Sequence, residues 1–479
     1  MIEAFLSAAQ RIDALLWGPW TMLFILGVSL YLTLRTRFFA VRKLGFILKQ
    51  TFGGILKKPG AKGRGVLTPF QATTTALAST VGMGSIAGVA TALSLGGPGA
   101  LFWMWVLALL GMITKTAEVT LAVHYREIDA RGRVRGGPMH YITKGLGWRP
   151  LAKVFSLSMF INAVFCASLL QAHTVGRAFL SSYGVNPYLT TGLMGLVTAV
   201  VVIGGVPRIG RFCEKLVPFM ALVYVFGGLA LFVLNAKALP SVLAMIVTYA
   251  FAPAPAAGAF AGAVVSKAIQ NAMTKGMLVS EAGLGTAPMV HATADTPHPF
   301  QQGLWGAFEV FIVSFVICTI TGFAILSSGV LGGGASGIDL AIAAFGARFP
   351  LPLARALLSF TILTFCLSTQ IGFFVYFETA VFFVFGEKTF LWLRWLYFVP
   401  AVAFAGVADV DRLWVLANIA VGLCAIPNLI AVLALSGVFL VLMKDCLSGQ
   451  NRYATAIIDE SRAYVRTART KTYAKEGET

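Results

Sequence analysis

Residues 73–99 read TTTALASTVGMGSIAGVATALSLGGPG, and the rest of the chain is organised around them. This stretch is long and apolar enough to cross a bilayer, yet Gly82-Met83-Gly84-Ser85 lies at its middle. Each glycine costs a helix about 1 kcal/mol relative to alanine, and bare backbone is tolerated at membrane depth only where it lines a cavity or is buried in protein. The stretch therefore predicts one of two structures: a glycine-packed helix crossing, or a helix broken to present backbone groups to a small polar solute or ion.

The composition is that of a membrane protein. Of the 479 residues, 58% are hydrophobic and 12% are charged, whereas soluble domains carry about 25% charged residues. The net charge of +18 could suggest a nucleic-acid partner, but the basic residues cluster in short loops between apolar segments. This is the positive-inside pattern, so we expect contacts with membrane lipids and no nucleic acid. The six cysteines are not spaced as a disulfide framework or a metal site.

Eleven segments are apolar and long enough to be predicted as membrane spans, at about 17–34, 67–95, 100–123, 151–180, 190–206, 218–234, 263–287, 303–326, 352–382, 390–405 and 413–442. Basic loops at 35–64, 126–149 and 207–215 and a basic tail at 444–479 then all fall on one side. The first of these loops contains a candidate interfacial helix. We predict a multi-pass protein of a bacterial inner membrane, with its N-terminus outside and its C-terminus in the cytoplasm.

The spans also suggest an internal symmetry. Ten spans follow the first and divide as five and five, and the first span of each half is interrupted by glycines. Paired interruptions at corresponding positions point to an inverted-repeat transporter with its site at the midplane. This favours the broken helix and divides the chain into four parts, which are an N-terminal region (1–66), two five-helix repeats (67–236 and 237–443) and a cytoplasmic tail (444–479).

A few polar residues within the spans are candidates for function. Glu281, near Gly283, could cap freed amides at the break, compensate a cation or carry a proton. A purely architectural role as a cap explains this residue as well as direct contact with a substrate or ion does. Ser368 and Thr369 could bond back to their own helix or supply oxygen ligands for a hard cation. The amide of Gln171 suits an amino-acid zwitterion.

Four further polar residues lie within the spans, and three of them have simpler explanations. Lys115 and Glu118 are three residues apart and are predicted to pair on one helical face. Glu309 lies within the eighth span, and His173 is interpreted as a packed, hydrogen-bonding group.

At these motifs the chain resembles the alanine or glycine:cation symporter family. The matches run from about residue 69 to 438 and include residues 76–127, GGPMHYI (136–142), EAGLGTAP (281–288) and AIPNLIAVLALSGV (425–438). The resemblance implies an all-α, leucine-transporter-type five-plus-five inverted repeat preceded by one extra helix. It implies a secondary transporter and not an enzyme, taking up alanine, glycine or a similar small amino acid with sodium and no other cofactor.

The resemblance also implies where the ligands bind. The substrate carboxylate is expected at the first broken helix, and the substrate ammonium is expected near Gln171 and the second broken helix. The substrate-binding residues are then predicted to be Gly82, Met83, Gly84, Ser85, Gln171, Ser280, Glu281 and Gly283. Sodium is expected at Thr80, Ser368 and Thr369, together with carbonyls of the first broken helix.

Several motifs depart from the family's usual pattern. The usual Gly-Thr-Gly-Asn reads Gly-Met-Gly-Ser at 82–85, Ser-Asn-Glu-Ala reads Val-Ser-Glu-Ala at 279–282, and Asp-Thr-Leu-Asn-Gly reads Asn-Ile-Ala-Val-Gly at 418–422. These changes remove oxygens that would favour sodium. Two alternatives therefore stay open: a proton-coupled or uncoupled carrier of another small solute, and a non-transporting membrane sensor on the same scaffold.

Overall fold

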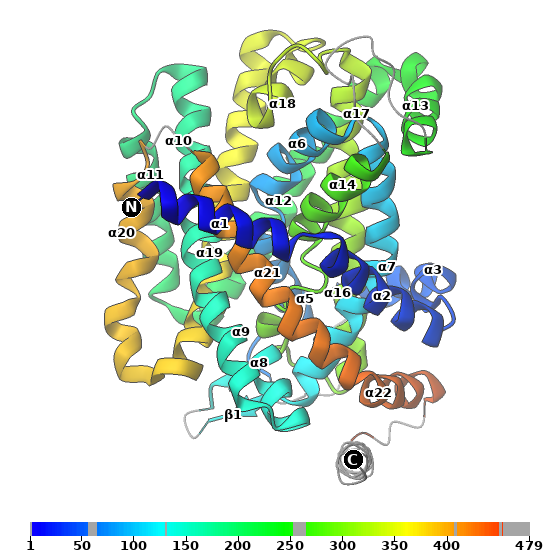
Figure 1. Cartoon of the computed structure of the whole chain (residues 1–479), viewed down its shortest axis with the longest axis vertical. Helices are drawn as coiled ribbons and strands as arrows, with labels where there is room; N and C mark the ends of the chain where they lie inside the picture. Colours follow the sequence, from blue (N-terminus) through cyan, green and yellow to red (C-terminus); the bar gives the residue numbers. More distant parts are fainter. Residues whose placement is uncertain are drawn as a thin grey trace.

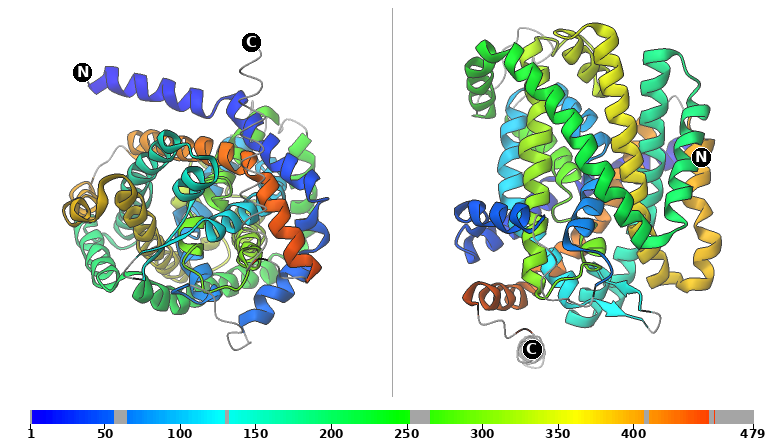
Figure 2. Two further views of the ribbon diagram at one scale, coloured as in Figure 1. Left: turned by 90° about the horizontal axis from the view of Figure 1, so that it is seen from below. Right: turned by 180° about the vertical axis from the view of Figure 1, so that it is seen from behind.

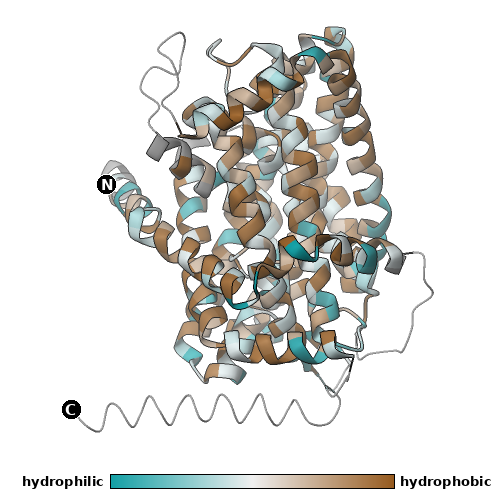
Figure 3. Ribbon diagram, turned by 90° about the vertical axis from the view of Figure 1, so that its right-hand side faces the viewer, coloured by the Kyte–Doolittle hydropathy of each residue, from teal (hydrophilic) through white to brown (hydrophobic). Residues whose placement is uncertain are grey.

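The computed structural model describes residues 2–55, 65–129, 132–251, 265–406, 410–449 and 453. They form a bundle of helices in which the long members stand side by side (Figure 1), with apolar residues along their lengths (Figure 3). Among the described residues, seven helical segments are long and apolar enough to cross a membrane: Ser7–Arg35, Gly99–His124, Arg149–Tyr183, Gly205–Leu234, Pro299–Ser328, Leu351–Leu393 and Trp414–Ala434. The predicted all-α membrane fold is confirmed.

The first half of the chain contains one small hairpin among its helices. Its elements are α1 (Ile2–Leu16), α2 (Pro19–Arg35), α3 (Phe39–Arg42), α4 (Leu44–Ile55), α5 (Pro69–Thr80), the 3-10 turn η1 (Met83–Ser85), α6 (Ala87–Gly96), α7 (Gly99–His124), the antiparallel strands β1 (Glu127–Ile128) and β2 (Val134–Arg135), α8 (Pro138–Tyr141), the π-helical η2 (Ile142–Leu146), α9 (Arg149–Asn162), the π-helical η3 (Ala163–Leu169), α10 (Leu170–Tyr183), α11 (Pro187–Val202) and α12 (Gly205–Leu234).

The second half is helical throughout its described residues. Its elements are the 3-10 turn η4 (Ala236–Ala238), α13 (Leu239–Phe251), α14 (Val265–Ser280), α15 (Pro288–His291), α16 (Pro299–Phe311), the π-helical η5 (Ile312–Ile317), α17 (Cys318–Ser328), α18 (Gly337–Gly346), α19 (Leu351–Leu393), α20 (Trp395–Ala403), α21 (Val410–Ala434) and α22 (Ser436–Ser448).

The span predicted at 67–95 is broken at its glycines. A capping box at Thr68 starts α5, in which Gln71 N donates to Thr68 Oγ1 at 3.1 Å and Thr68 N donates to Gln71 Oε1 at 3.2 Å. The helix ends at Thr80, and Gly82 has an extended backbone (φ −121°, ψ −156°) before the chain re-enters a helix as α6. The structure therefore confirms a break in place of a continuous glycine-packed helix.

The seventh predicted span is broken as well. Its helix α14 ends at Ser280, and the next turn of chain has positive φ at Glu281 (52°), Gly283 (92°) and Gly285 (75°). Two of these positions are glycines, which adopt that conformation without steric cost. Glu281 adopts it as a non-glycine residue, a conformation that persists where surrounding contacts fix the side chain.

Three sequence predictions about boundaries are wrong. The segment 207–215 is not a loop but the first turns of α12, because Pro207 is tolerated in the first turn of a helix. The last span does not run to residue 442. Helix α21 ends at Ala434, and α22 begins at Ser436, where serine and glycine favour helix poorly, and lies across the lower end of the bundle (Figure 1).

The third wrong boundary is that between the ninth and tenth spans. Helix α19 extends past residue 382, and the chain changes direction at Gly386 (φ 78°). The first two residues of the span predicted at 263–287 lie outside the described residues, as do most residues of the tail.

The two broken helices are tied together at the start of α5. Asp295 N donates to Leu67 O at 2.7 Å, and Val66 N donates to Thr293 O at 2.8 Å, so the chain before α5 pairs with the chain after α15. Helix α7 packs against both α14 and α16. Helix α5 packs against α12 and α19. These contacts place both helix breaks in the interior of the bundle.

Candidate functional site

The break after α5 frees a carbonyl that two hydroxyls then bind. Gly82 N donates to Thr80 O at 3.1 Å instead of to Ala78 O, its regular helical partner. Ser368 Oγ and Thr369 Oγ1 of α19 donate to Ala78 O at 3.2 and 3.1 Å. Both hydroxyls also lie within hydrogen-bond distance of a carbonyl of their own helix. Three neutral oxygen atoms thus converge at the end of α5.

On the other side of the break lies Gln171, from α10. Its Oε1 accepts a hydrogen bond from Met83 N at 3.2 Å. A methyl group on Gly82 would lie 2.5 Å from Thr369 Oγ1 and 3.2 Å from Gln171 Oε1. Gly82 therefore lies between the glutamine predicted for the substrate and the threonine predicted for sodium, and its missing side chain is what lets both approach.

The residues after Gly82 close the break. The side chain of Met83 is 3% exposed, and its sulfur lies 3.1 Å from Thr174 Oγ1. A β-carbon on Gly84 would lie 3.3 Å from a methyl of Val279 in α14. Ser85 is fully buried, and its hydroxyl has no hydrogen-bond partner among the described residues. Buried hydroxyls are normally hydrogen-bonded, so this one is available to a ligand.

The second break is held by side chains from three directions. Thr286 Oγ1 donates to Glu281 Oε2 at 2.5 Å, and Lys115 Nζ of α7 donates to Ser280 O at 3.4 Å. The carbonyl of Gly283 accepts a hydrogen bond from Asn428 Nδ2 of α21 at 2.8 Å. Ser280, Glu281 and Gly283 are thus all buried at this break, and each is bound there by a side chain of the protein itself.

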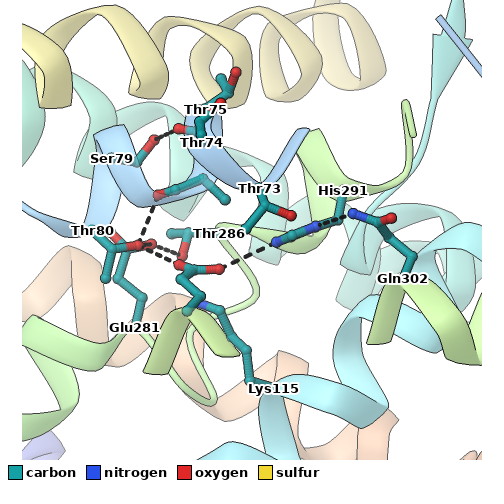
Figure 4. Close-up of polar contacts among 12 residues, drawn as sticks. Thr73, Thr74, Thr75, Ser79, Thr80, Lys115, Glu281, Thr286, His291 and Gln302 are labelled. Atoms are coloured by element: carbon teal, nitrogen blue, oxygen red, sulfur yellow. Dashed lines mark hydrogen bonds and ion pairs between the residues drawn. The ribbon is translucent and has the colours of Figure 1, made fainter. Parts of the chain in front are cut away.

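Charged side chains connect the two breaks (Figure 4). Lys115 Nζ lies 3.3 Å from Glu309 Oε1, and neither side chain is exposed. Thr80 Oγ1 donates to Glu309 Oε1 at 2.5 Å and lies 3.5 Å from Glu281 Oε2. The prediction placed Thr80 with Ser368 and Thr369, but its hydroxyl faces these carboxylates instead.

The predicted pairing of Lys115 with Glu118 is wrong. Lys115 pairs with Glu309, whereas Glu118 Oε1 accepts a hydrogen bond from Asn428, whose own Oδ1 accepts one from Tyr141. The reason is that tertiary partners on other helices reach each side chain better than the neighbour three residues along. Glu118 Oε2 has no hydrogen-bond partner among the described residues.

A chain of hydrogen bonds extends this cluster away from the breaks. Gln302 Nε2 donates to His291 Nδ1 at 2.8 Å and to Pro69 O at 3.4 Å, while His291 Nε2 lies 3.2 Å from Glu309 Oε2. Because Nδ1 accepts, the proton of the neutral imidazole is on Nε2, which donates to Glu309. The histidine thereby adds a donor to a carboxylate that is already bound by Thr80 and Lys115.

Comparison with known proteins agrees with this architecture. A family model described as the sodium:alanine symporter family matches residues 2–458. The chain belongs to this family. It is 36% identical over 442 residues to the sodium/alanine symporter AgcS of Methanococcus maripaludis, covering 91% of this chain and 95% of that protein. It is 37% identical over 435 residues to the "Probable sodium/glutamine symporter GlnT" of Bacillus subtilis, covering 90% of this chain and 88% of that protein.

Among solved structures, the fold is similar to that of MhsT, determined in complex with L-phenylalanine. The TM-score is 0.55 at 13% identity, covering 85% of this chain and 99% of that one. As a member of the family, the protein is a multi-pass membrane transporter of the leucine-transporter type and not an enzyme.

The structure places the predicted site residues in two groups, one at each helix break. The structure brings together Gly82, Met83 and Gln171, and it brings Ser368 and Thr369 to the same break. The second group, around Glu281, lies at the second break, where Thr286 and Asn428 contact it, while His291 contacts Glu309 and Gln302 contacts His291. The sequence alone did not single out these four partners, Thr286, His291, Gln302 and Asn428. All but Gln302 lie in or beside the family motifs 281–288 and 425–438.

Proposed function

We propose that the protein is a secondary active symporter that takes up a small neutral amino acid, such as alanine or glycine, together with sodium by alternating access. The observation that carries this proposal is the position of Gly82, with Gln171 on one side and Thr369 on the other. One helix break thereby adjoins both a candidate amino-acid site and a candidate cation site, so the binding of either ligand changes the packing around the other.

The amino acid would bind along the break. Helix α6 begins at Ala87, and the amides and positive dipole at its start favour a carboxylate. The unpartnered hydroxyl of Ser85 lies just before this helix and would donate to the same carboxylate. The ammonium would meet Gln171 and the carbonyls near Ser280. Because the large side chain of Met83 is buried at the break, the space left there suits an amino acid with a small side chain better than it suits glutamine.

Sodium would bind where Ser368, Thr369 and Ala78 O converge. Hard cations prefer oxygen ligands, including carbonyl oxygens, and turning the two hydroxyls would direct their lone pairs at a shared cation. Thr80 is not part of this proposal, because its hydroxyl is engaged by Glu309. We also propose that the basic segments face the cytoplasm of a bacterial inner membrane, with the N-terminus outside.

Uptake of labelled alanine into proteoliposomes tests this function. An inward sodium gradient is expected to drive concentrative uptake, whereas an imposed proton gradient without sodium is not. Protein-free liposomes and a Thr364→Val variant serve as controls, since among the described residues the Thr364 hydroxyl bonds only to carbonyls of its own helix. Uptake that ignores sodium would refute the coupling, and absence of both uptake and saturable binding would refute the transporter function altogether.

A second candidate is proton coupling, which the charges around Lys115 favour. Glu118, Glu281 and Glu309 are each at most 3% exposed, and Lys115 is the buried lysine beside them. An uncompensated buried carboxylate is costly, so this cluster favours holding a proton or an extra cation. In that case uptake would follow a proton gradient, and Glu281→Gln would abolish proton-driven uptake.

A further inference from the structure

A groove on the outer surface of the bundle, between α11 and α12, is separate from the transport site. Its volume is about 920 Å³, and nearly all of its surface is apolar. Helix α12 contributes Arg208, Arg211 and Lys215, which line the groove chiefly with the apolar stems of their side chains, and helix α11 contributes the apolar side chains Leu196, Val197 and Val200. Those three apolar side chains are 61%, 42% and 48% exposed, so the protein leaves this wall uncovered.

The cations of the groove are not neutralised by the part of the chain that the structure describes. Arg208, Arg211 and Lys215 form no ion pair there. The acid on the same stretch of helix, Glu214, accepts a hydrogen bond from Gln71 of α5 at 2.9 Å. The positive charges therefore lie beside an apolar wall with no anion of their own.

The position of the groove matches one leaflet of a membrane. Helix α12 rises from its turn with α11 to the end of the bundle where α13 lies (Figure 2), so the groove lies toward the opposite end. Beyond the cations, exposed apolar side chains continue along both helices toward the middle of the bundle, where Leu193 is 56% exposed and Phe219 is 55% exposed. The cations thus lie near one membrane interface, with an apolar path leading from them toward the membrane centre.

We propose that this groove binds one anionic phospholipid, with its phosphate among Arg208, Arg211 and Lys215 and an acyl chain against Leu196, Val197 and Val200. Basic pockets between helices recognise such head groups, and long basic side chains reach the interface along their apolar stems. A free inorganic anion would leave the apolar wall unused, and an uncharged lipid would leave the cations unpaired. A second copy of the chain would set basic walls against each other.

Native mass spectrometry of the full-length protein, from nanodiscs of equal phosphatidylglycerol and phosphatidylcholine, tests the proposal. The wild type is expected to retain one phosphatidylglycerol in preference to phosphatidylcholine. Arg208→Gln/Arg211→Gln/Lys215→Gln is expected to weaken retention by about five-fold for each cation removed. The matched control is Lys49→Gln/Arg149→Gln/Lys153→Gln, which removes as many exposed cations elsewhere and should retain the lipid.

A second variant keeps the three cations and fills the groove with a larger apolar side chain. Val200→Trp is expected to reduce retention of phosphatidylglycerol, and it guards against a triple variant that fails to fold. Competition with inorganic phosphate or with glycerophosphoglycerol, which has the head group alone, should not displace the lipid. Any of four results would overturn the proposal. These are equal retention of the two lipids, an equal loss of phosphatidylglycerol in the control triple variant, displacement of the lipid by either free anion, or a dimer that forms in the wild type and is lost in the groove variants.

Discussion

The ammonium of Lys115 lies 3.3 Å from a carboxylate oxygen of Glu309, and both side chains are fully buried. The same ammonium donates to Ser280 O, where α14 ends, and the same carboxylate accepts from Thr80, where α5 ends. The pair thus joins the ends of both broken helices through α7 and α16. We infer that it fixes the spacing of the two breaks, and that a change at one break is felt at the other.

Removing one partner of this pair is expected to be strongly destabilising. Lys115→Met leaves the carboxylate of Glu309 buried without its cation, which costs about 3–5 kcal/mol. The matched control is Lys144→Met, whose lysine pairs with Glu127 at 3.1 Å with side chains 37% and 53% exposed, and which should cost at most about 1 kcal/mol. Thermal unfolding of both variants measures the difference, and equal losses would show that burial of the pair is unimportant.

Gly82→Ala is expected to impair transport without straining the backbone. The backbone of Gly82 is extended, a conformation that alanine adopts, but its β-carbon would lie 2.5 Å from Thr369 Oγ1. Sodium-dependent uptake should fall about ten-fold or more, since overpacking costs about 1–3 kcal/mol. Gly192→Ala in α11, where a β-carbon meets nothing within 4 Å, should leave uptake unchanged. Normal uptake by Gly82→Ala would contradict the assigned contacts.

Ser85→Ala separates a ligand contact from a structural one. The Ser85 hydroxyl is buried with no partner among the described residues, so its removal should leave the ligand-free protein as stable as before or more so. Alanine affinity should fall about ten-fold, because a hydrogen bond to a charged group is worth about 1.5–3 kcal/mol. Ser156→Ala, whose hydroxyl donates to Ala152 O at 2.9 Å, should not change affinity. Unchanged alanine affinity in Ser85→Ala would remove this serine from the site.

His298 links the start of α16 to α22 and should make stability depend on pH. Its Nδ1 accepts from Phe300 N at 3.0 Å, and its Nε2 lies 3.3 Å from Asp445 Oδ2. Burial lowers the pKa of His298 from 6.5, although the hydrogen bond with Asp445 opposes this shift. The folded state therefore favours the neutral imidazole, whose Nδ1 caps the helix.

The sign follows from the lowered pKa. The contribution of His298 to stability is complete above the unfolded pKa of about 6.5 and is lost as pH falls below it. Unfolding followed from pH 8 to 5 should show this loss, and His298→Asn, which keeps a capping oxygen but does not titrate in this range, should flatten it. An identical pH profile in His298→Asn would assign the effect to another group.

Much of the fold and part of the site follow from local features of the sequence. The glycines at 82–85 and 283–285 predicted both helix breaks, because backbone conformation is a local property. The positions of Ser368 and Gln171 near the first break were expected only from the family resemblance. The partner of Lys115 could not be predicted in this way, since Glu309 reaches it from another helix. The start of α12 was not predicted because its basic residues lie on an exposed helix surface, and a run of basic residues between apolar segments is also typical of a loop.

In the proposed function one helix break holds two ligands, with the amino acid on the Gln171 side of Gly82 and sodium on the Thr369 side. Equilibrium binding of labelled alanine to the purified protein, titrated with sodium, measures both affinities at once. Thr369→Ala is expected to raise the sodium concentration needed for half-maximal binding by about ten-fold while restoring full binding at high sodium. Gln171→Ala is expected to weaken alanine binding even at saturating sodium. Alanine binding that is independent of sodium in the wild type, or that neither substitution changes, would show that the two ligands do not share this break.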